Sequence, residues 1–152
     1  MRKVKLGIIG TGLAAKNLHL PALQKLKSKF EIVAVCNHTE KKAKDFAKLV
    51  GGVPVYKDYQ ELLKRDDIEA VDITLPIHLN YKVARDSINA GKHVILEKPL
   101  AGNMREAKEL LKLDKKFKTM GQRIIRWQSA LFINFRSLKI VNIIEVPFIP
   151  EF

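Results

Sequence analysis

The segment from Lys5 to Asn17, KLGIIGTGLAAKN, most constrains what this chain can fold into. Its apolar start runs directly into a G-x-G-x-x-A spacing formed by Gly10, Gly12 and Ala15. Between a buried strand and a helix, this spacing is typical of a loop that binds the pyrophosphate of a dinucleotide. The first glycine permits a tight turn, the second lets phosphate approach the backbone, and the alanine keeps the helix close to the sheet. Leu13 is expected at the helix N-terminus, whose amide groups and positive potential favour an anion.

The rest of the chain alternates strands and helices, which argues against the alternative of an incidental glycine turn. Buried strands are expected at residues 4–9, 31–37, 53–56, 70–75 and 93–97. Helices are expected at 39–50, 58–65, 80–90 and 104–117, and a further helix after the glycine loop should be interrupted at Pro21. Thr39, Asp58 and Asn103 are the expected N-caps. This order is that of right-handed βαβ units, so we predict a doubly wound, mainly parallel α/β sheet of the Rossmann type.

Composition narrows the class of protein. The 152 residues suit one domain, and a hydrophobic content of 47% indicates a globular chain with a substantial core. Charged residues interrupt every apolar run, so no membrane segment is expected. Cys36 is the only cysteine, which excludes an internal disulfide or a multi-cysteine zinc site and indicates a reducing cytoplasm. No metal site is expected.

The net charge of +12 could indicate binding to nucleic acid through a basic face. However, the lysines fall mostly on the exposed faces of the predicted helices, and the sequence shows neither a recognition helix nor an aromatic RNA-binding motif. We therefore expect no nucleic-acid partner and interpret the charge as favouring an anionic small ligand.

The end of the second strand should select the nucleotide. An acidic residue there would bind the adenosine ribose hydroxyls and repel a 2′-phosphate. The chain instead has Asn37, His38 and Thr39, followed by Lys41 and Lys42, which together favour a phosphate dianion. We therefore predict NADP as the preferred cofactor, with NAD as the alternative. Under the other interpretation, His38 and the lysines only begin a solvated helix.

The tripeptide Glu97-Lys98-Pro99 follows a predicted buried strand, at the edge where open α/β sheets bind ligands. Pro99 ends the strand and stiffens the turn that carries Lys98. The Lys98 ammonium could polarise a substrate oxygen beside a nicotinamide, which makes Lys98 the candidate catalytic residue. A surface ion pair is the alternative for the tripeptide taken alone.

In their order, the segments GIIGTGLAA, HLPAL, VAVCN, YKDYQELLK, AVDITLP and AGKHVILEKPLA resemble the nucleotide-binding half of the Gfo/Idh/MocA (glucose–fructose oxidoreductase / inositol dehydrogenase) family, over about residues 3–113. Members are typically NAD(P)-dependent dehydrogenases of sugars and polyols, or reductases of related carbonyl compounds. The resemblance implies that the glycine loop holds the pyrophosphate and that Asn37 and His38 lie at the adenosine ribose.

The resemblance also implies roles nearer the reaction. Leu75 and Pro76 match the family's Thr-Pro beside the cofactor, Glu97 the residue near the nicotinamide ribose, and Lys98 the residue that reaches the reactive carbon. One departure is that Asn80 holds the usual position of a histidine. His78, two residues away, is expected to cap or pack rather than to catalyse.

The end of the chain differs in character from the rest. Residues 1–120 are expected to form the NAD(P)-binding Rossmann domain, and 121–152 an apolar segment nearly free of acids. This segment could form a helix over 121–135 followed by a strand, or be a poorly specified tail left by truncation or a frameshift. The family's second domain, which carries the substrate pocket, is expected to be missing.

The expected function is that of the nicotinamide-binding domain of an oxidoreductase, which transfers a hydride to or from a sugar, polyol or related carbonyl compound. We expect the chain to be inactive alone. A non-catalytic dinucleotide-binding module with a redox-sensing or interaction role is the alternative, and a basic nucleic-acid binder is a third. The apolar tail could drive self-association into a homo-oligomer.

Overall fold

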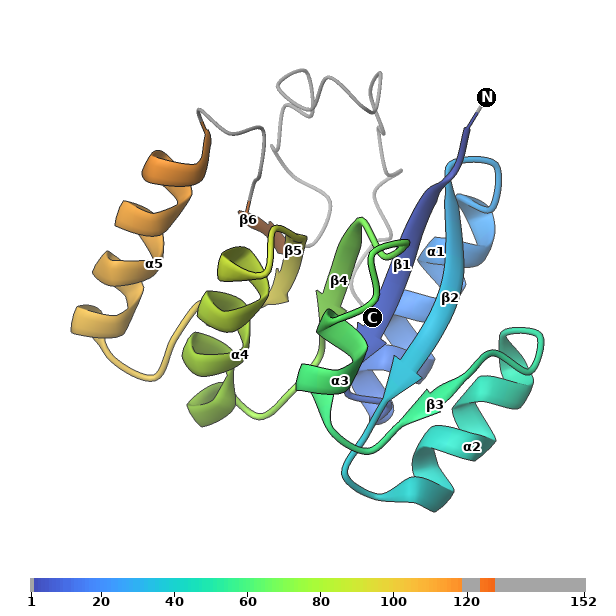
Figure 1. Ribbon diagram of the computed structural model, residues 1–152. Helices are drawn as coiled ribbons and strands as arrows, with labels where there is room; N and C mark the ends of the chain where they lie inside the picture. The colour runs from blue at the N-terminus through green and yellow to red at the C-terminus, as the bar shows by residue number, and fades with distance from the viewer. Residues whose placement is uncertain (1, 119–123, 128–152) are drawn as a thin grey trace.

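A six-stranded parallel sheet forms the centre of the computed structural model, which describes residues 2–118 and 124–127 (Figure 1). The strands lie in the order β3-β2-β1-β4-β5-β6, and every neighbouring pair is parallel. Their bounds are β1 Val4–Ile9, β2 Phe30–Cys36, β3 Val55–Tyr56, β4 Ala70–Ile73, β5 His93–Glu97 and β6 Ile124–Trp127. This is the doubly wound Rossmann order, so the predicted fold class is confirmed.

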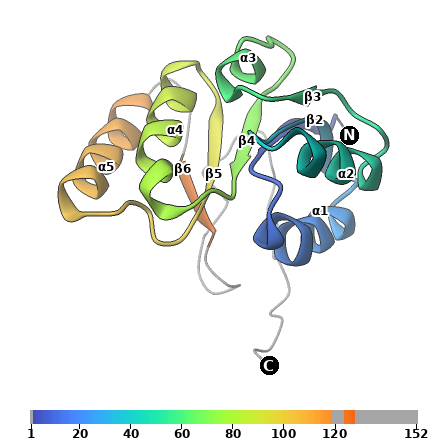
Figure 2. The same ribbon diagram turned by 90° about the horizontal axis from the view of Figure 1, so that it is seen from below.

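Helical segments cover both faces of the sheet. They are the π-helical turn η1 Ala15–His19, then α1 Leu20–Lys25, α2 Glu40–Leu49, α3 Tyr59–Leu63, α4 Ile77–Asn89 and α5 Met104–Lys118. Figure 2 shows α1 and α2 on one side of the strands and α3, α4 and α5 on the other. Among the described residues, no helix is long and apolar enough to cross a membrane.

Two apolar cores result, one on each face, because side chains of a strand alternate between its two sides. In β1, Leu6 and Ile8 pack into the core beneath η1, α1 and α2, together with Phe46 of α2. Ile9 points the other way, into the core that includes Leu62 of α3. The sheet is therefore buried on both faces, as continuous apolar strand segments predict.

The observed boundaries differ from the expected ones at several points. Pro21 does not break its helix, because it lies in the first turn of α1, where a missing N–H group is tolerated. α4 begins three residues before the expected Asn80. The side chains of Asp58 and Asn103 accept the expected capping hydrogen bonds from Gln60 and Glu106. Thr39 is the N-cap residue of α2, but its side chain makes no capping hydrogen bond.

A strand is present in the segment for which the sequence allowed either a helix or a poorly specified tail. Residues 124–127 form β6, which pairs with β5 from Ile124↔Val94 to Trp127↔Glu97. A helix over 121–135 is therefore wrong at these residues, because the edge of β5 offers backbone partners that local sequence does not reveal. The division at residue 120 remains a prediction, and the expected tail from residue 128 onward lies outside the described residues.

Gly10, directly after β1, contacts the ends of both neighbouring strands, β2 and β4. Its backbone has φ +98°, and its N–H donates to the carbonyl oxygen of Cys36 at 2.9 Å. A Cβ atom placed there would lie 2.5 Å from the carbonyl oxygen of Thr74, at the end of β4. Both the conformation and the space therefore require glycine.

We predict that Gly10→Ala lowers the free energy of unfolding by about 3 kcal/mol or more, since backbone strain and overpacking act together. Gly51→Ala is the matched control. Gly51 has φ +95°, but a Cβ there meets nothing within 4 Å, so only strain of about 1–2 kcal/mol should apply. Denaturant unfolding of the two variants checks the difference, and equal losses would contradict a close approach at Gly10.

Candidate functional site

The carboxyl ends of the central strands lie level with one another. Ile9 of β1 pairs with Cys36 of β2 and with Ile73 of β4, and Ile73 pairs with Leu96 of β5. In Figure 1 the arrows of β1, β2 and β4 point downward, and Figure 2 views the molecule from that end. The residues that follow therefore meet at one edge, on either side of the point where chain order reverses between β1 and β4: Gly10, Asn37, Thr74 and Glu97.

The glycine loop has two glycines with different roles. Gly10 is required by the fold, as described above, whereas Gly12 is exposed and a Cβ there would meet nothing within 4 Å. Helical backbone begins directly after it, since the N–H of Lys16 donates to the Gly12 carbonyl at 3.0 Å. Ala15 is fully buried and Leu13 is 77% exposed. The loop thus leaves open space over a helix N-terminus, which fits a pyrophosphate.

Asn37, at the end of β2, is held by its neighbours. Its Nδ2 donates to Thr11 Oγ1 at 2.8 Å, and its Oδ1 accepts from the backbone N–H of Thr39 at 2.9 Å. The Asn37 amide has a second N–H, which makes no hydrogen bond within the described part of the chain. His38 is exposed beside it, so the expected ribose position carries polar groups without an acid.

The turn at Lys98 is built from β5 and braced by α4. The backbone N–H of Lys98 donates to Glu97 Oε2 at 2.9 Å, and the Lys98–Pro99 peptide bond is cis. Asn80 is buried and its Nδ2 donates to the carbonyl oxygen of Pro99 at 3.1 Å. Lys98 itself is exposed, and among the described residues its ammonium makes no ion pair. The alternative of a surface ion pair is therefore not observed there.

Leu75 and Pro76 connect β4 to α4 at the same edge. Leu75 is half-buried against the core beneath α3, α4 and α5, and Pro76 is the exposed N-cap residue of α4. His78 is exposed in the first turn of α4. The N-cap residue Pro76 makes no side-chain capping hydrogen bond, and the role of His78 stays a prediction.

A buried histidine joins two carboxylates at this edge, and sequence reasoning missed it. His19 Nδ1 lies 3.0 and 2.8 Å from the two oxygens of Asp72, and Nε2 lies 2.8 Å from Glu97 Oε1. His19 and Asp72 are at most 1% exposed. The signal was an acid inside the apolar strand AVDI, which needs a buried partner. Within the described chain, this cluster does not form a set that could hold a metal ion.

Within this cluster, the pKa values of His19 and Asp72 are both raised above their usual values. Burial by itself would lower the pKa of His19, but the hydrogen bonds and charges of Asp72 and Glu97 outweigh it and raise that pKa above 6.5. Burial raises the pKa of Asp72, and the His19 ring opposes that effect. The free thiol of Cys36 is also buried, and burial with the charge of Asp58 raises its pKa to about 12, so it is not a nucleophile.

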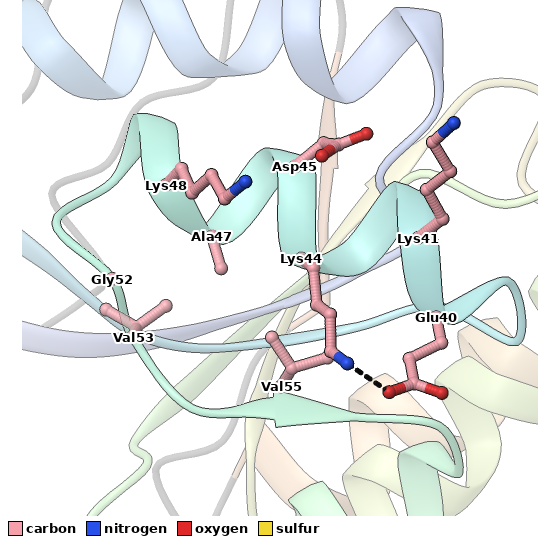
Figure 3. A pocket seen from close by; sticks show the side chains of 9 residues that line it. All are labelled: Glu40, Lys41, Lys44, Asp45, Ala47, Lys48, Gly52, Val53 and Val55. Atoms are coloured by element: carbon pink, nitrogen blue, oxygen red, sulfur yellow. Dashed lines mark ion pairs between the residues drawn. The ribbon is translucent and has the colours of Figure 1, made fainter.

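A surface hollow among the described residues lies elsewhere. It has a volume of about 550 Å³ and runs along the flank of α2 beside β3 (Figure 3). Lys44 crosses it to pair with Glu40, and Ala47, Val53 and Val55 line its apolar side. Neither the glycine loop nor the Lys98 turn borders it. It is therefore a groove between a helix and an edge strand rather than part of the level edge.

The amino-acid sequence of this chain is similar to those of known oxidoreductases. The model of the oxidoreductase family Gfo/Idh/MocA, NAD-binding Rossmann fold, matches residues 4–122. An uncharacterised protein of Saccharomyces cerevisiae is 40% identical over 116 residues, which are 74% of this chain and 33% of that protein. A dTDP-3,4-didehydro-2,6-dideoxy-α-D-glucose 3-reductase of Actinomadura kijaniata is 36% identical over 107 residues, 70% of this chain and 32% of the enzyme.

The fold of this chain is also similar to that of solved oxidoreductase structures. A 3-ketoreductase from Actinomadura kijaniata in complex with NADP and TDP-benzene aligns with a TM-score of 0.74 and 32% identity, over 82% of this chain and 37% of that one. The chain thus spans about a third of the length of the curated relatives it matches. With a family model matched over most of its length, a confirmed Rossmann order and a glycine loop at the switch point, this chain belongs to the Gfo/Idh/MocA family of oxidoreductases.

Proposed function

We propose that this chain binds NADP along the carboxyl edge of its sheet. The observation that carries this proposal is the open space at Gly12, over a helix N-terminus and next to a strand end without an acid. Gly10, Gly12, Leu13 and Ala15 would hold the pyrophosphate, and Asn37, His38 and Thr39 the adenosine ribose with its 2′-phosphate. Leu75, Pro76 and Glu97 would border the nicotinamide half.

We further propose that the intact protein is an NADP-dependent oxidoreductase acting on a sugar, polyol or related carbonyl compound. The bound cofactor supplies hydride chemistry at its nicotinamide ring. Lys98 would bind the reacting oxygen of the substrate and stabilise negative charge there, since its ammonium is exposed at the edge and unpaired among the described residues. The reductases found among the relatives support this class of reaction.

The division of labour within the intact protein is also a proposal. Residues 1–120, together with β6, would form the cofactor-binding unit, since β6 completes the sheet beside β5. The family's second domain would supply the substrate pocket and further proton-transfer groups. Titration of cofactors against this chain, followed by turnover with a panel of sugars and polyols when that domain is joined to it, separates an enzyme from a non-catalytic dinucleotide-binding module.

Gly12→Val tests the pyrophosphate site. We expect dinucleotide affinity to fall about 100-fold or more, roughly 3 kcal/mol, because the new side chain occupies the space where phosphate must lie. Stability should change little, since no neighbour lies within 4 Å of the new Cβ. The control is Gly102→Val, in the loop before α5, where the nearest atom to an added Cβ is Glu106 Oε2 at 3.8 Å. Calorimetric titration that finds wild-type affinity for both NAD and NADP in Gly12→Val would refute the site.

Asn37→Asp tests the preference for NADP. The new carboxylate would still accept the Thr39 N–H, and the Thr11 hydroxyl can donate to it, so the fold should tolerate the change. We expect the preference to shift toward NAD by about 1–2 kcal/mol, through repulsion of the 2′-phosphate.

The control for this change is Asn89→Asp, which adds the same charge at the exposed end of α4, beside the opposite edge of the sheet. Affinities for NADP and NAD are measured for all three proteins. A wild type that already binds NAD more tightly than NADP would show that the interpretation of Asn37 is wrong.

A further inference from the structure

We infer that His19 is a positioning residue, which fixes the Glu97 carboxylate and through it the turn that presents Lys98. The inference rests on the proposed function only in assuming that this turn presents Lys98 to substrate. The arrangement itself is built from η1, β4 and β5, three elements far apart in the sequence.

The chain of contacts runs from the buried core to the exposed edge. His19 Nε2 meets Glu97 Oε1 at 2.8 Å, and the other oxygen of the same carboxylate accepts the Lys98 N–H at 2.9 Å. The Glu97 side chain is 16% exposed, whereas the His19 side chain is 1% exposed. The buried His19 ring thus holds the Glu97 carboxylate, and that carboxylate holds the backbone of Lys98. Lys98 is the residue proposed to contact substrate.

Asp72 determines how the ring is oriented. It lies in β4 between the apolar residues Val71 and Ile73, and both its oxygens approach the same ring nitrogen. Among the described residues, Asp72 of β4 and Glu97 of β5 are charged groups that face the ring. For both nitrogens to donate to carboxylates, the ring must carry two protons. Burial alone works against that charge, so the two acids must hold the second proton in place.

A purely stabilising role explains this arrangement poorly. Buried ion pairs often add little to stability compared with apolar residues of similar volume, because desolvation offsets the attraction. Asn80 braces the same turn from the other side through the carbonyl of Pro99. Two buried polar side chains thus converge on three consecutive residues, as expected where geometry at the edge matters more than stability.

The ring can be tested without any substitution. In the full chain, nitrogen NMR of the histidine rings should show both nitrogens of His19 protonated at neutral pH. His93, at the opposite end of β5, is the internal control: burial lowers its pKa, and its Nδ1 has no partner among the described residues, so it should be neutral. A neutral His19 ring at neutral pH would overturn the inference.

The role in positioning is tested with whole and shortened ligands. In the proposed site NADPH would reach the Lys98 turn, whereas 2′-phosphoadenosine diphosphoribose, which lacks the nicotinamide, would occupy only the remaining part. In His19→Leu we expect NADPH affinity to fall about tenfold while affinity for the shortened ligand stays within about twofold of wild type. His93→Gln should leave both affinities unchanged.

Glu97→Gln gives a second route should His19→Leu fail to fold. Its amide oxygen can still accept from the ring, but its NH₂ group cannot accept from the Lys98 N–H, so the same selective loss is expected. Equal losses for both ligands, or none for either, in the folded variants would overturn the inference. A wild type that binds neither ligand refutes the proposed function instead, and the NMR result still decides whether the ring holds Glu97.

Stability should follow pH with opposite signs for the two histidines. The folded pKa of His19 is raised above 6.5, so its contribution is complete below that pH and is lost as pH rises through the folded pKa. The folded pKa of His93 is lowered, so its contribution is present above 6.5 and is lost on acidification. Denaturant unfolding from about pH 6 to about pH 9 should show a decline in wild type and His93→Gln that is absent in His19→Leu.

Discussion

The close approach of the Gly10 backbone to the end of β4 is the constraint on which the rest of this structure depends. Without a side chain at that position, the loop after β1 can turn across the sheet and contact the ends of both neighbouring strands. The helix that follows then starts directly over the edge, with Gly12 open to solvent. A larger residue would separate the loop from Thr74 and move that helix away from the place where all the site residues meet.

Much of this arrangement follows from local sequence. The glycine spacing, the apolar strands and the capping residues Asp58 and Asn103 act over a few neighbouring residues, so their effects are predictable from a single chain. The positions of Asn37 and Lys98 followed from the rule that ligands bind beyond the carboxyl ends of parallel strands. The parts that escaped prediction depend on partners distant in sequence. β6 forms because β5 offers an unpaired edge, and His19 acquires its role from acids more than 50 residues away.

The buried cluster of His19, Asp72 and Glu97 shows that an apolar strand pattern does not reveal contacts between distant polar residues. Asp72 interrupts a strand that otherwise reads as core, and its burial would be unfavourable unless a cation met it. His19 pairs with Asp72 and also contacts Glu97. The pairing that compensates the burial of Asp72 in β4 therefore also connects β4 to the carboxyl edge of the sheet. A polar residue in a core strand is therefore a useful guide to where two distant elements must be held together.

The π-helical turn that carries His19 has a consequence for how this segment can vary. A π-helical turn accommodates one more residue than the α-helix, and here it buries Ala15 and His19 while leaving residues 16–18 exposed. Loss of any one exposed residue would restore α-helical spacing and place His19 three residues after Ala15, still on the same side of the helix. The wider turn thus absorbs one residue without turning the ring away from Asp72, whereas each further residue lost from an α-helix would rotate the ring by roughly 100°. The number of residues between the glycine loop and His19 can therefore vary by one at little cost, and larger insertions or deletions here should be far less tolerated than substitutions.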